Sequence, residues 1–304
     1  MSSFARVNRL WSATLATLAV SLAGPAAALA KVNEDFKPQN EFKLDPWIGI
    51  HVFGIDMSIN KGVFMLVLAA LFTGFTVAIV ARKMVTTGRP GRIQAAVEIA
   101  YDVAHDTITG RNIHDSKIAR RWFPFLATLF LFIWFCNILG FVPLPTNTEH
   151  KINLFGAHLP TFALYAATAN VAVPLTLALI IFFSQHIEGI KAKGPFGYVK
   201  SWIPTGTPAA VLPIIVPVEV LSQFLRLISL TARLFANMLA GHMIILIMGG
   251  GMVVLLGIPY IFPLTATLGV FIYFLDVMLV ATLQAFIFAT LSAIYLGGAV
   301  ASEH

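Results

Sequence analysis

The sequence predicts an all-α, polytopic membrane protein, and its composition and the lengths of its apolar runs are the observations that predict it. Of the 304 residues, 58% are hydrophobic and 11% are charged, with a mean hydropathy of +0.83. An ordinary soluble domain has about 25% charged residues, so a soluble globule is excluded. The single Cys136 excludes a disulfide framework and a thiolate-rich metal site. We expect about five membrane helices and one interfacial amphipathic helix.

Residues 1–30 predict a cleavable export signal. Two arginines precede an apolar stretch that ends in PAAALA, where Ala28 and Ala30 have the spacing of a signal-peptidase site. An uncleaved membrane anchor and an organellar presequence are the alternatives. Residues 31–62 are mixed and polar, and we expect them to form an extracytoplasmic N-terminal segment.

Residues 63–304 form the predicted membrane domain. A bilayer core about 30 Å thick requires about 20 apolar helical residues, and runs of this length are bounded here by charged residues. The predicted spans lie near residues 63–81, 123–142, 161–183, 207–248 and 260–297.

The last two spans are too long to cross the bilayer upright. Pro217 and Pro263 precede their helical runs and glycines follow both, which leaves helices of 31 and 33 residues. These helices would be about 46 and 50 Å long. We therefore expect them to form a strongly inclined hairpin. An inclined hairpin exposes a long side surface within the membrane, to which an extended partner could bind.

The distribution of charge predicts the topology. Eight basic residues lie between Arg82 and Arg121, in the connection between the first two spans. This pattern is typical of a cytoplasmic connection rather than of a nucleic-acid-binding patch, although the net charge is +6. Residues 184–206, with three lysines, would lie on the same side. The N-terminus is predicted outside and the C-terminus in the cytoplasm.

Residues 92–108 within that connection have an amphipathic pattern. Apolar side chains such as Val97 and Ile108 fall near one side of a helix, and charged ones such as Glu98 and Asp102 fall largely on the other. The pattern predicts a helix at the cytoplasmic interface, and a helix packed under the spans would have the same pattern.

Ionisable residues near the C-terminus give the strongest functional signal. Between residues 207 and 300 the formally charged side chains are Glu219, Arg226, Arg233 and Asp276, and His242 can become charged near neutral pH. Such groups are costly at bilayer depth, so they face a partner charge or a wet cavity and mark ion paths. Glu219, Arg226 and Arg233 recur every seven residues and lie on one stripe of a helix. Alternatively, Arg226 pairs with Glu219 and extends to the interface.

His242 defines a second polar face on the same helix. Ser229 and Asn237, each four residues from Arg233, flank the charged stripe, whereas His242 is nine residues beyond Arg233 and about 180° away. Two polar faces predict two separate aqueous environments. A packing contact between helices is the alternative for His242.

The last helix carries two further polar residues, and small residues lie next to the charged stripe. On the last helix, Asp276 and Gln284 are eight residues apart, so they lie at neighbouring depths but about 80° apart around the axis. Ala232, Ala236 and Ala240 recur every four residues and allow a close approach by another backbone, either within the hairpin or from a partner.

Three segments resemble subunit a of F-type ATP synthases. SLTARLFANMLAGH, residues 229–242, is similar to the family signature, and TLQAFIFATLSAIYL, residues 282–296, is similar to its last helix. FCNILGFVPLPT, residues 135–146, is similar to the exit of its second span. The resemblance covers roughly residues 60–300. It implies the stator half of a proton path in a bacterial inner membrane, with a ring of c subunits, the b subunits of the peripheral stalk and other F0F1 subunits as partners.

The resemblance also implies roles for single residues. It places seven residues on the proton path, which are Arg233, Asn237, Ser229, Glu219, His242, Gln284 and Asp276. Arg233 would be the essential arginine that faces the ring carboxylate, with Gln284 near it. Glu219 would line the cytoplasmic half-channel and His242 the opposite half-channel.

One position departs from the family pattern. The family usually has His or Glu seven residues before the glutamine of the last helix, and that position is Val277, whereas Asp276 is eight residues before Gln284. Either the helix carries a one-residue irregularity, or Asp276 reaches the channel from a shifted angle.

The sequence lacks the motifs that are typical of other classes of function. The sequence contains no GxxxxGK[ST], GxGxxG or HExxH motif and no clustered carboxylates, so we expect no nucleotide hydrolysis, cofactor or catalytic metal in this chain. The rival hypothesis is an ion-coupled secondary transporter with Arg233 and Asp276 at its substrate site. It predicts inverted repeats and broken helices in both halves, and neither is found.

Overall fold

The structure is a computed structural model that describes residues 42–52, 55–56, 58–83, 91–154, 157–203, 208–251 and 259–301. The predicted export signal lies outside the described residues. The chain divides into two units, which are Glu41–His242 with Phe274–His304, and Met243–Tyr273 with Met1–Asn40.

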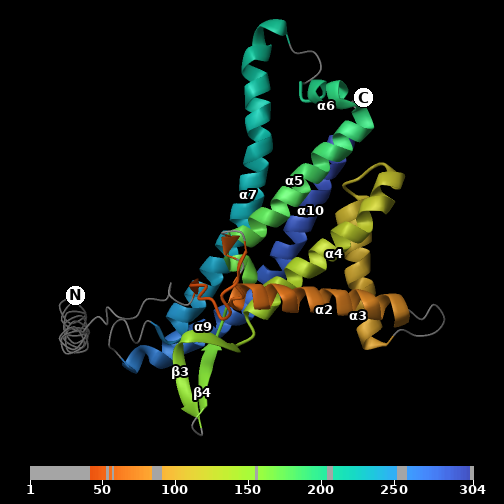
Figure 1. Cartoon of the computed structure of the whole chain (residues 1–304). Coiled ribbons are helices and arrows are strands. Elements are labelled where there is room, and N and C mark those ends of the chain that lie inside the picture. The colour runs from red at the N-terminus through yellow and green to blue at the C-terminus, as the bar shows by residue number, and fades with distance from the viewer. Residues whose placement is uncertain are drawn as a thin grey trace, which may run out of the picture. The chain divides into compact units, whose positions relative to one another are not determined.

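Five helices in the described part of the chain are long and apolar enough to cross a membrane, which confirms the predicted polytopic membrane protein (Figure 1). They are Lys61–Ile79, Ser116–Gly140, Ala172–Lys193, Leu212–Gly249 and Phe262–Val300. The first, second and third correspond to α2 (Lys61–Lys83), α4 (Ser116–Gly140) and α5 (Ala172–Lys193). The fourth consists of α7 (Leu212–Leu246) and the start of a π-helical turn, Ile247–Gly251. The fifth joins α9 (Phe262–Leu275), the π-helical turn Asp276–Val280 and α10 (Ala281–Val300).

The core of the larger unit forms where α10 packs against α4 and α5, and α2 packs against α4 (Figure 1). The contact face of α10 carries a ladder of fully buried alanines four residues apart, at Ala281, Ala285, Ala289 and Ala293. Small side chains at this spacing let neighbouring helix backbones approach closely. Leu230, Leu234 and Met238 of α7 belong to the same buried cluster.

The amphipathic segment is helical, as predicted, and packs under the spans. It consists of α3 (Arg92–Asp102) and the π-helical segment Val103–Gly110. Ala104 and Ile108 are buried against α4 and α10, whereas His105 and Asp106 are exposed. The second of the two interpretations of this pattern, a helix under the spans, therefore fits the structure.

Two antiparallel strand pairs lie in the described part of the chain, one before α2 and one between α4 and α5. They are β1 (His51–Val52) with β2 (Ile55–Asp56), and β3 (Leu144–Leu154) with β4 (Ala157–Ala163). Short 3-10 turns lie at Ala167–Ala169, Ala209–Val211 and Pro259–Ile261. These strands were not predicted from the sequence, and they lie outside the five membrane-length helices.

The third span is displaced from the predicted residues 161–183 to Ala172–Lys193. Before Ala172 the chain forms the strand Ala157–Ala163 and the 3-10 turn Ala167–Ala169. Residues 165–169 are buried, and Ala166 lies against Gly140, where an added Cβ would clash with it. The Asn170 side chain then accepts a hydrogen bond from the Ala172 amide and starts α5. The helix continues past Phe183 until Gly194, whose φ of 73° ends it.

The last two helices are longer than their proline and glycine boundaries predicted, at 38 and 39 residues, or about 57 and 59 Å. Pro217 lies inside α7, where it leaves the Pro213 carbonyl without its helical partner. Pro263 lies in the first turn of α9, where a missing amide is tolerated. Gly297 is buried inside α10, because the Asn112 backbone occupies the space of a side chain. The inclination of these helices in a bilayer remains a prediction.

Within the larger unit, α7 and the last helix run in opposite directions, as a hairpin requires. The Arg226 guanidinium lies 5.7 Å from the centre of the Tyr295 ring, and Gly241 contacts Asp276. Within the smaller unit, Gly269 lies against the backbone of Gly249.

Candidate functional site

One face of α7 is buried and the opposite face is exposed. Leu230, Leu234 and Met238, four residues apart, point into the core. The other face carries Ser229, Ala232, Arg233, Ala236 and Ala240, which are all exposed. The predicted polar and small-residue stripe is therefore the outward face of the helix.

Arg233 lies near the middle of this exposed face. Among the described residues, no side chain forms an ion pair or a hydrogen bond with Arg233. Arg226, two turns earlier, differs because its guanidinium lies 3.8 Å from the Glu219 carboxylate and over the Tyr295 ring. The alternative that Arg226 pairs with Glu219 therefore fits the structure, whereas Arg233 has no counter-charge among the described residues.

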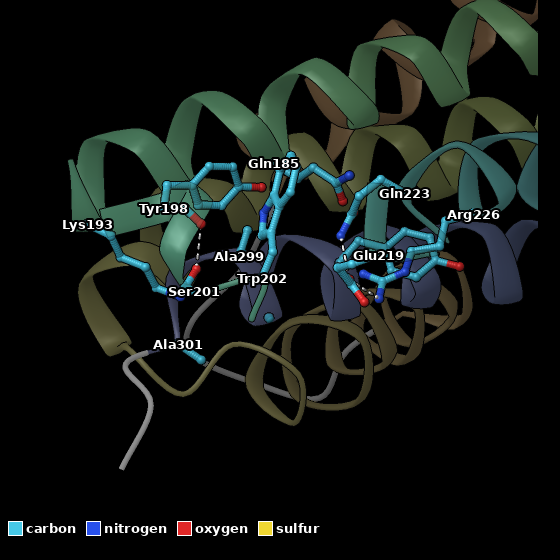
Figure 2. A pocket seen from close by; sticks show the side chains of 12 residues that line it. Gln185, Lys193, Tyr198, Ser201, Trp202, Glu219, Gln223, Arg226, Ala299 and Ala301 are labelled. Carbon is cyan, nitrogen blue, oxygen red and sulfur yellow. Dashed lines mark hydrogen bonds and ion pairs between the residues drawn. The ribbon is translucent and has the colours of Figure 1, made fainter. Parts of the chain in front are cut away.

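The first polar region is a cavity of about 440 Å³ that contains Glu219 (Figure 2). Its main polar side chains are Gln185, Lys193, Tyr198, Ser201, Glu219, Gln223 and Arg226. Gln223 donates a hydrogen bond of 3.0 Å to Glu219. Gln223 therefore places a hydrogen-bond donor, and Arg226 a positive charge 3.8 Å away, beside the Glu219 carboxyl group.

A turn between α5 and α6 (Pro195–Lys200) builds one wall of this cavity. Gly194 has a positive φ of 73°, a conformation that glycine adopts without strain. Gly189 has no Cβ, and an added one would clash with the Tyr198 ring, which therefore lies directly on α5. Burial raises the pKa of the Tyr198 hydroxyl, so this group stays neutral at physiological pH.

The second polar region surrounds His242, which is fully buried. Its Nδ1 lies 2.8 Å from the Met238 carbonyl oxygen and its Nε2 lies 3.0 Å from the Gly140 carbonyl oxygen. The Phe141 ring stacks on the imidazole with centroids 4.6 Å apart. Because a carbonyl only accepts, each contact requires an N–H on the ring nitrogen that makes it, and a neutral imidazole carries one N–H at a time.

Asp276 is buried next to Gly241, in the same region as His242. Its Oδ2 has no hydrogen-bond partner among the described residues. The unpartnered oxygen leaves room for a hydrogen-bond donor.

The π-helical turn Asp276–Val280 explains the departure from the family pattern. A π-helical turn accommodates one extra residue in an α-helix. The eight-residue separation of Asp276 and Gln284 is therefore equivalent to seven residues of uninterrupted helix. The first explanation, a one-residue irregularity, is confirmed. Gln284 itself is buried on α10.

The structure also identifies polar residues that sequence reasoning missed. Asn137 is fully buried, donates to the Ala281 carbonyl at 3.1 Å and accepts from the Thr168 hydroxyl. Gln223 was detectable, because it lies one helical turn after Glu219. No signal in the sequence pointed to Gln185, which lies on another helix.

The arrangement consists of an exposed arginine on α7 that pairs with no described residue, a polar cavity toward one end of the helix, and a buried region with His242 and Asp276 toward the other. A family model described as "ATP synthase A chain" matches residues 62–297. The chain is similar to "ATP synthase subunit a" of Beijerinckia indica subsp. indica, with 32% identity over 274 residues, 89% of this chain and 98% of the relative. It is also similar to "ATP synthase subunit a" of Rhodospirillum rubrum, with 31% identity over 86% of this chain and 98% of the relative. In Gluconacetobacter diazotrophicus, the protein of the same name is 36% identical over 78% of this chain and 84% of its own length. The chain therefore belongs to the ATP synthase A chain family.

Proposed function

We propose that this chain is the proton-translocating stator subunit of an F-type ATP synthase, with two half-channels that lead to Arg233 against a rotating ring of c subunits. One observation carries the proposal: Arg233 is exposed in the middle of an apolar helix and has no counter-charge among the described residues. The guanidinium stays protonated in proteins. A permanent cation at bilayer depth requires an anionic partner, which we assign to another subunit.

The chemistry of that partner follows from the cost of burying charge. A carboxylate that faces lipid is stable only in its neutral form, because an isolated buried charge is costly. Beside Arg233 the ionised form is favoured, so the carboxylate releases its proton there. A moving ring of carboxylates therefore exchanges protons as each one passes the arginine.

The two polar regions support separate routes for the proton. Glu219 and His242 are 23 residues apart on one helix, about 34 Å along its axis, and Arg233 lies between them. The Glu219 cavity would open to the cytoplasm and the His242–Asp276 region to the opposite side. The fixed charge of Arg233 repels a proton that would cross directly from one route to the other. Net transfer then requires movement of the ring.

The location, orientation and partners of the subunit are also part of the proposed function. It would lie in a bacterial inner membrane, with its N-terminus outside and its C-terminus in the cytoplasm, which agrees with the basic connection between α2 and α4. The c-ring, the b subunits of the peripheral stalk and the other F0F1 subunits would be its partners. Nucleotide chemistry would occur on those other subunits.

The test compares Arg233→Ala with Arg226→Ala in membranes with verified subunit content. We expect Arg233→Ala to abolish coupled ATP synthesis and to allow passive proton leak, because the cation between the two routes is lost. Arg226→Ala should reduce synthesis only in part, because Gln223 still holds Glu219. Full coupled activity in Arg233→Ala would contradict the proposal.

A further inference from the structure

Gln185 is a buried polar side chain that none of the roles above uses. It lies on α5, is 3% exposed and lines the Glu219 cavity. No other described residue forms a hydrogen bond with its amide. Figure 2 shows the amide pointing from α5 toward the side of the cavity where Gln223 and Glu219 lie.

The surroundings of α5 change character at this residue. Ile181, one turn earlier, is 4% exposed and packs in the apolar core cluster. A buried amide without a partner costs about 1–3 kcal/mol, so a position that only packs against the core favours an apolar residue. Gln185 instead lies at the point where α5 leaves the apolar cluster and lines the cavity.

Water is the partner that fits this amide. The cavity of about 440 Å³ has room for several water molecules, and it carries the polar groups that ordered water requires. The charged and titratable groups that line it are Lys193, Tyr198, Glu219, Arg226 and Tyr295. An amide both donates and accepts, so it can hold a water molecule in either orientation.

We propose that Gln185 is a positioning residue of the proton path, which orders the water that connects Glu219 with the aqueous phase. The amide does not itself release a proton, so it acts through the water and not as a carrier. This inference rests on the proposed function, because it concerns the same half-channel. It adds a contribution from α5 to a path otherwise assigned to α7 and the last helix.

The first measurement tests whether Gln185 meets water. Cysteine is introduced as Gln185→Cys or, as a matched control one turn earlier, Ile181→Cys, in the complete complex with Cys136→Ser. We expect silver ions to inhibit ATP-driven proton pumping in the Gln185→Cys membranes and to leave the Ile181→Cys membranes unaffected. No inhibition of Gln185→Cys, or equal inhibition of both, would overturn the inference.

The second measurement tests the polar group itself. Gln185→Leu keeps the bulk of the side chain and removes the amide, whereas Gln185→Asn keeps the amide. With equal subunit content, we expect Gln185→Leu to lower passive proton conductance several-fold and to change its dependence on cytoplasmic pH, and Gln185→Asn to restore both in part. Wild-type conductance in Gln185→Leu would overturn the inference.

The Arg233→Ala variant measured in parallel separates the two proposals. If it loses coupled synthesis while both Gln185 tests fail, only the role of Gln185 is rejected. If it keeps full coupled synthesis, the stator function is rejected, whatever the Gln185 variants show.

Discussion

Gly241 and Asp276 are in such close contact that a Cβ atom on the glycine would lie 2.5 Å from the Asp276 Oδ2. The carboxylate of the last helix therefore occupies the space that any other residue at position 241 would need for its side chain. Because Gly241 directly precedes His242, this contact brings the carboxylate beside the helical turn that carries the imidazole.

We predict that Gly241→Ala slows proton translocation while the subunit still assembles. The methyl group has to displace Asp276, which moves the carboxylate out of its position beside α7. The rate of ATP-driven proton pumping in membrane vesicles measures the effect. Gly74→Ala is the control, because a Cβ there would meet no atom within 4 Å. Equal rates in both variants would show that the position of Asp276 is unimportant.

His242→Ala and Asp276→Ala are each expected to reduce the rate of proton translocation without abolishing it. Water can replace a relay group in a wet channel, although it does not reproduce the hydrogen bonds of His242 to Gly140 and Met238. The rate of proton flux as a function of pH should shift in both variants. An unchanged rate and pH profile in both would return these residues to a packing role.

Arg233→Lys is expected to fail in coupled synthesis although it keeps a basic residue. Lysine lacks the planar fork of the guanidinium, and it loses its proton more readily when it is desolvated. The loss should approach that of Arg233→Ala, as measured by ATP synthesis at equal subunit content. Substantial synthesis in Arg233→Lys would show that charge alone is sufficient at this position.

The N-terminus of the mature protein is predicted near Lys31. The PAAALA sequence has the spacing that signal peptidase recognises, so residues 1–30 should be absent after export. Mass spectrometry of the subunit from purified membranes measures its N-terminus directly. An intact Met1 would identify the segment as a membrane anchor.

The features that the sequence predicted well are those that a single helix determines. Arg233 was identifiable because a charge within a long apolar run has few structural explanations, and the helical period alone placed Ala232 and Ala236 beside it. The hydrophobic period also predicted the helix at residues 92–108. It did not predict that Ile108 packs against other helices and not at the membrane interface.

The features that the sequence did not predict depend on contacts between segments. Residues 161–171 are apolar enough to be predicted as part of a span, but residues 165–169 are buried by contacts such as that of Ala166 with Gly140, which no local pattern encodes. Gln185 and Glu219 are 34 residues apart, and only the packing of α5 beside α7 brings them to one cavity. The π-helical turn at Asp276 was recognised only as a mismatch of one residue.

The alanine ladder of α10 has a mechanical consequence. Alanine has no side-chain torsion that can change to another rotamer, so the contacts of α10 with α4 and α5 have almost no means of yielding locally. Leu234 and Met238 of α7 pack into the same buried cluster, so the helix that carries Arg233 shares one core with the alanine contacts. A bulkier residue in the alanine ladder could be accommodated only by moving whole helix backbones apart, because no change of rotamer could make room for it.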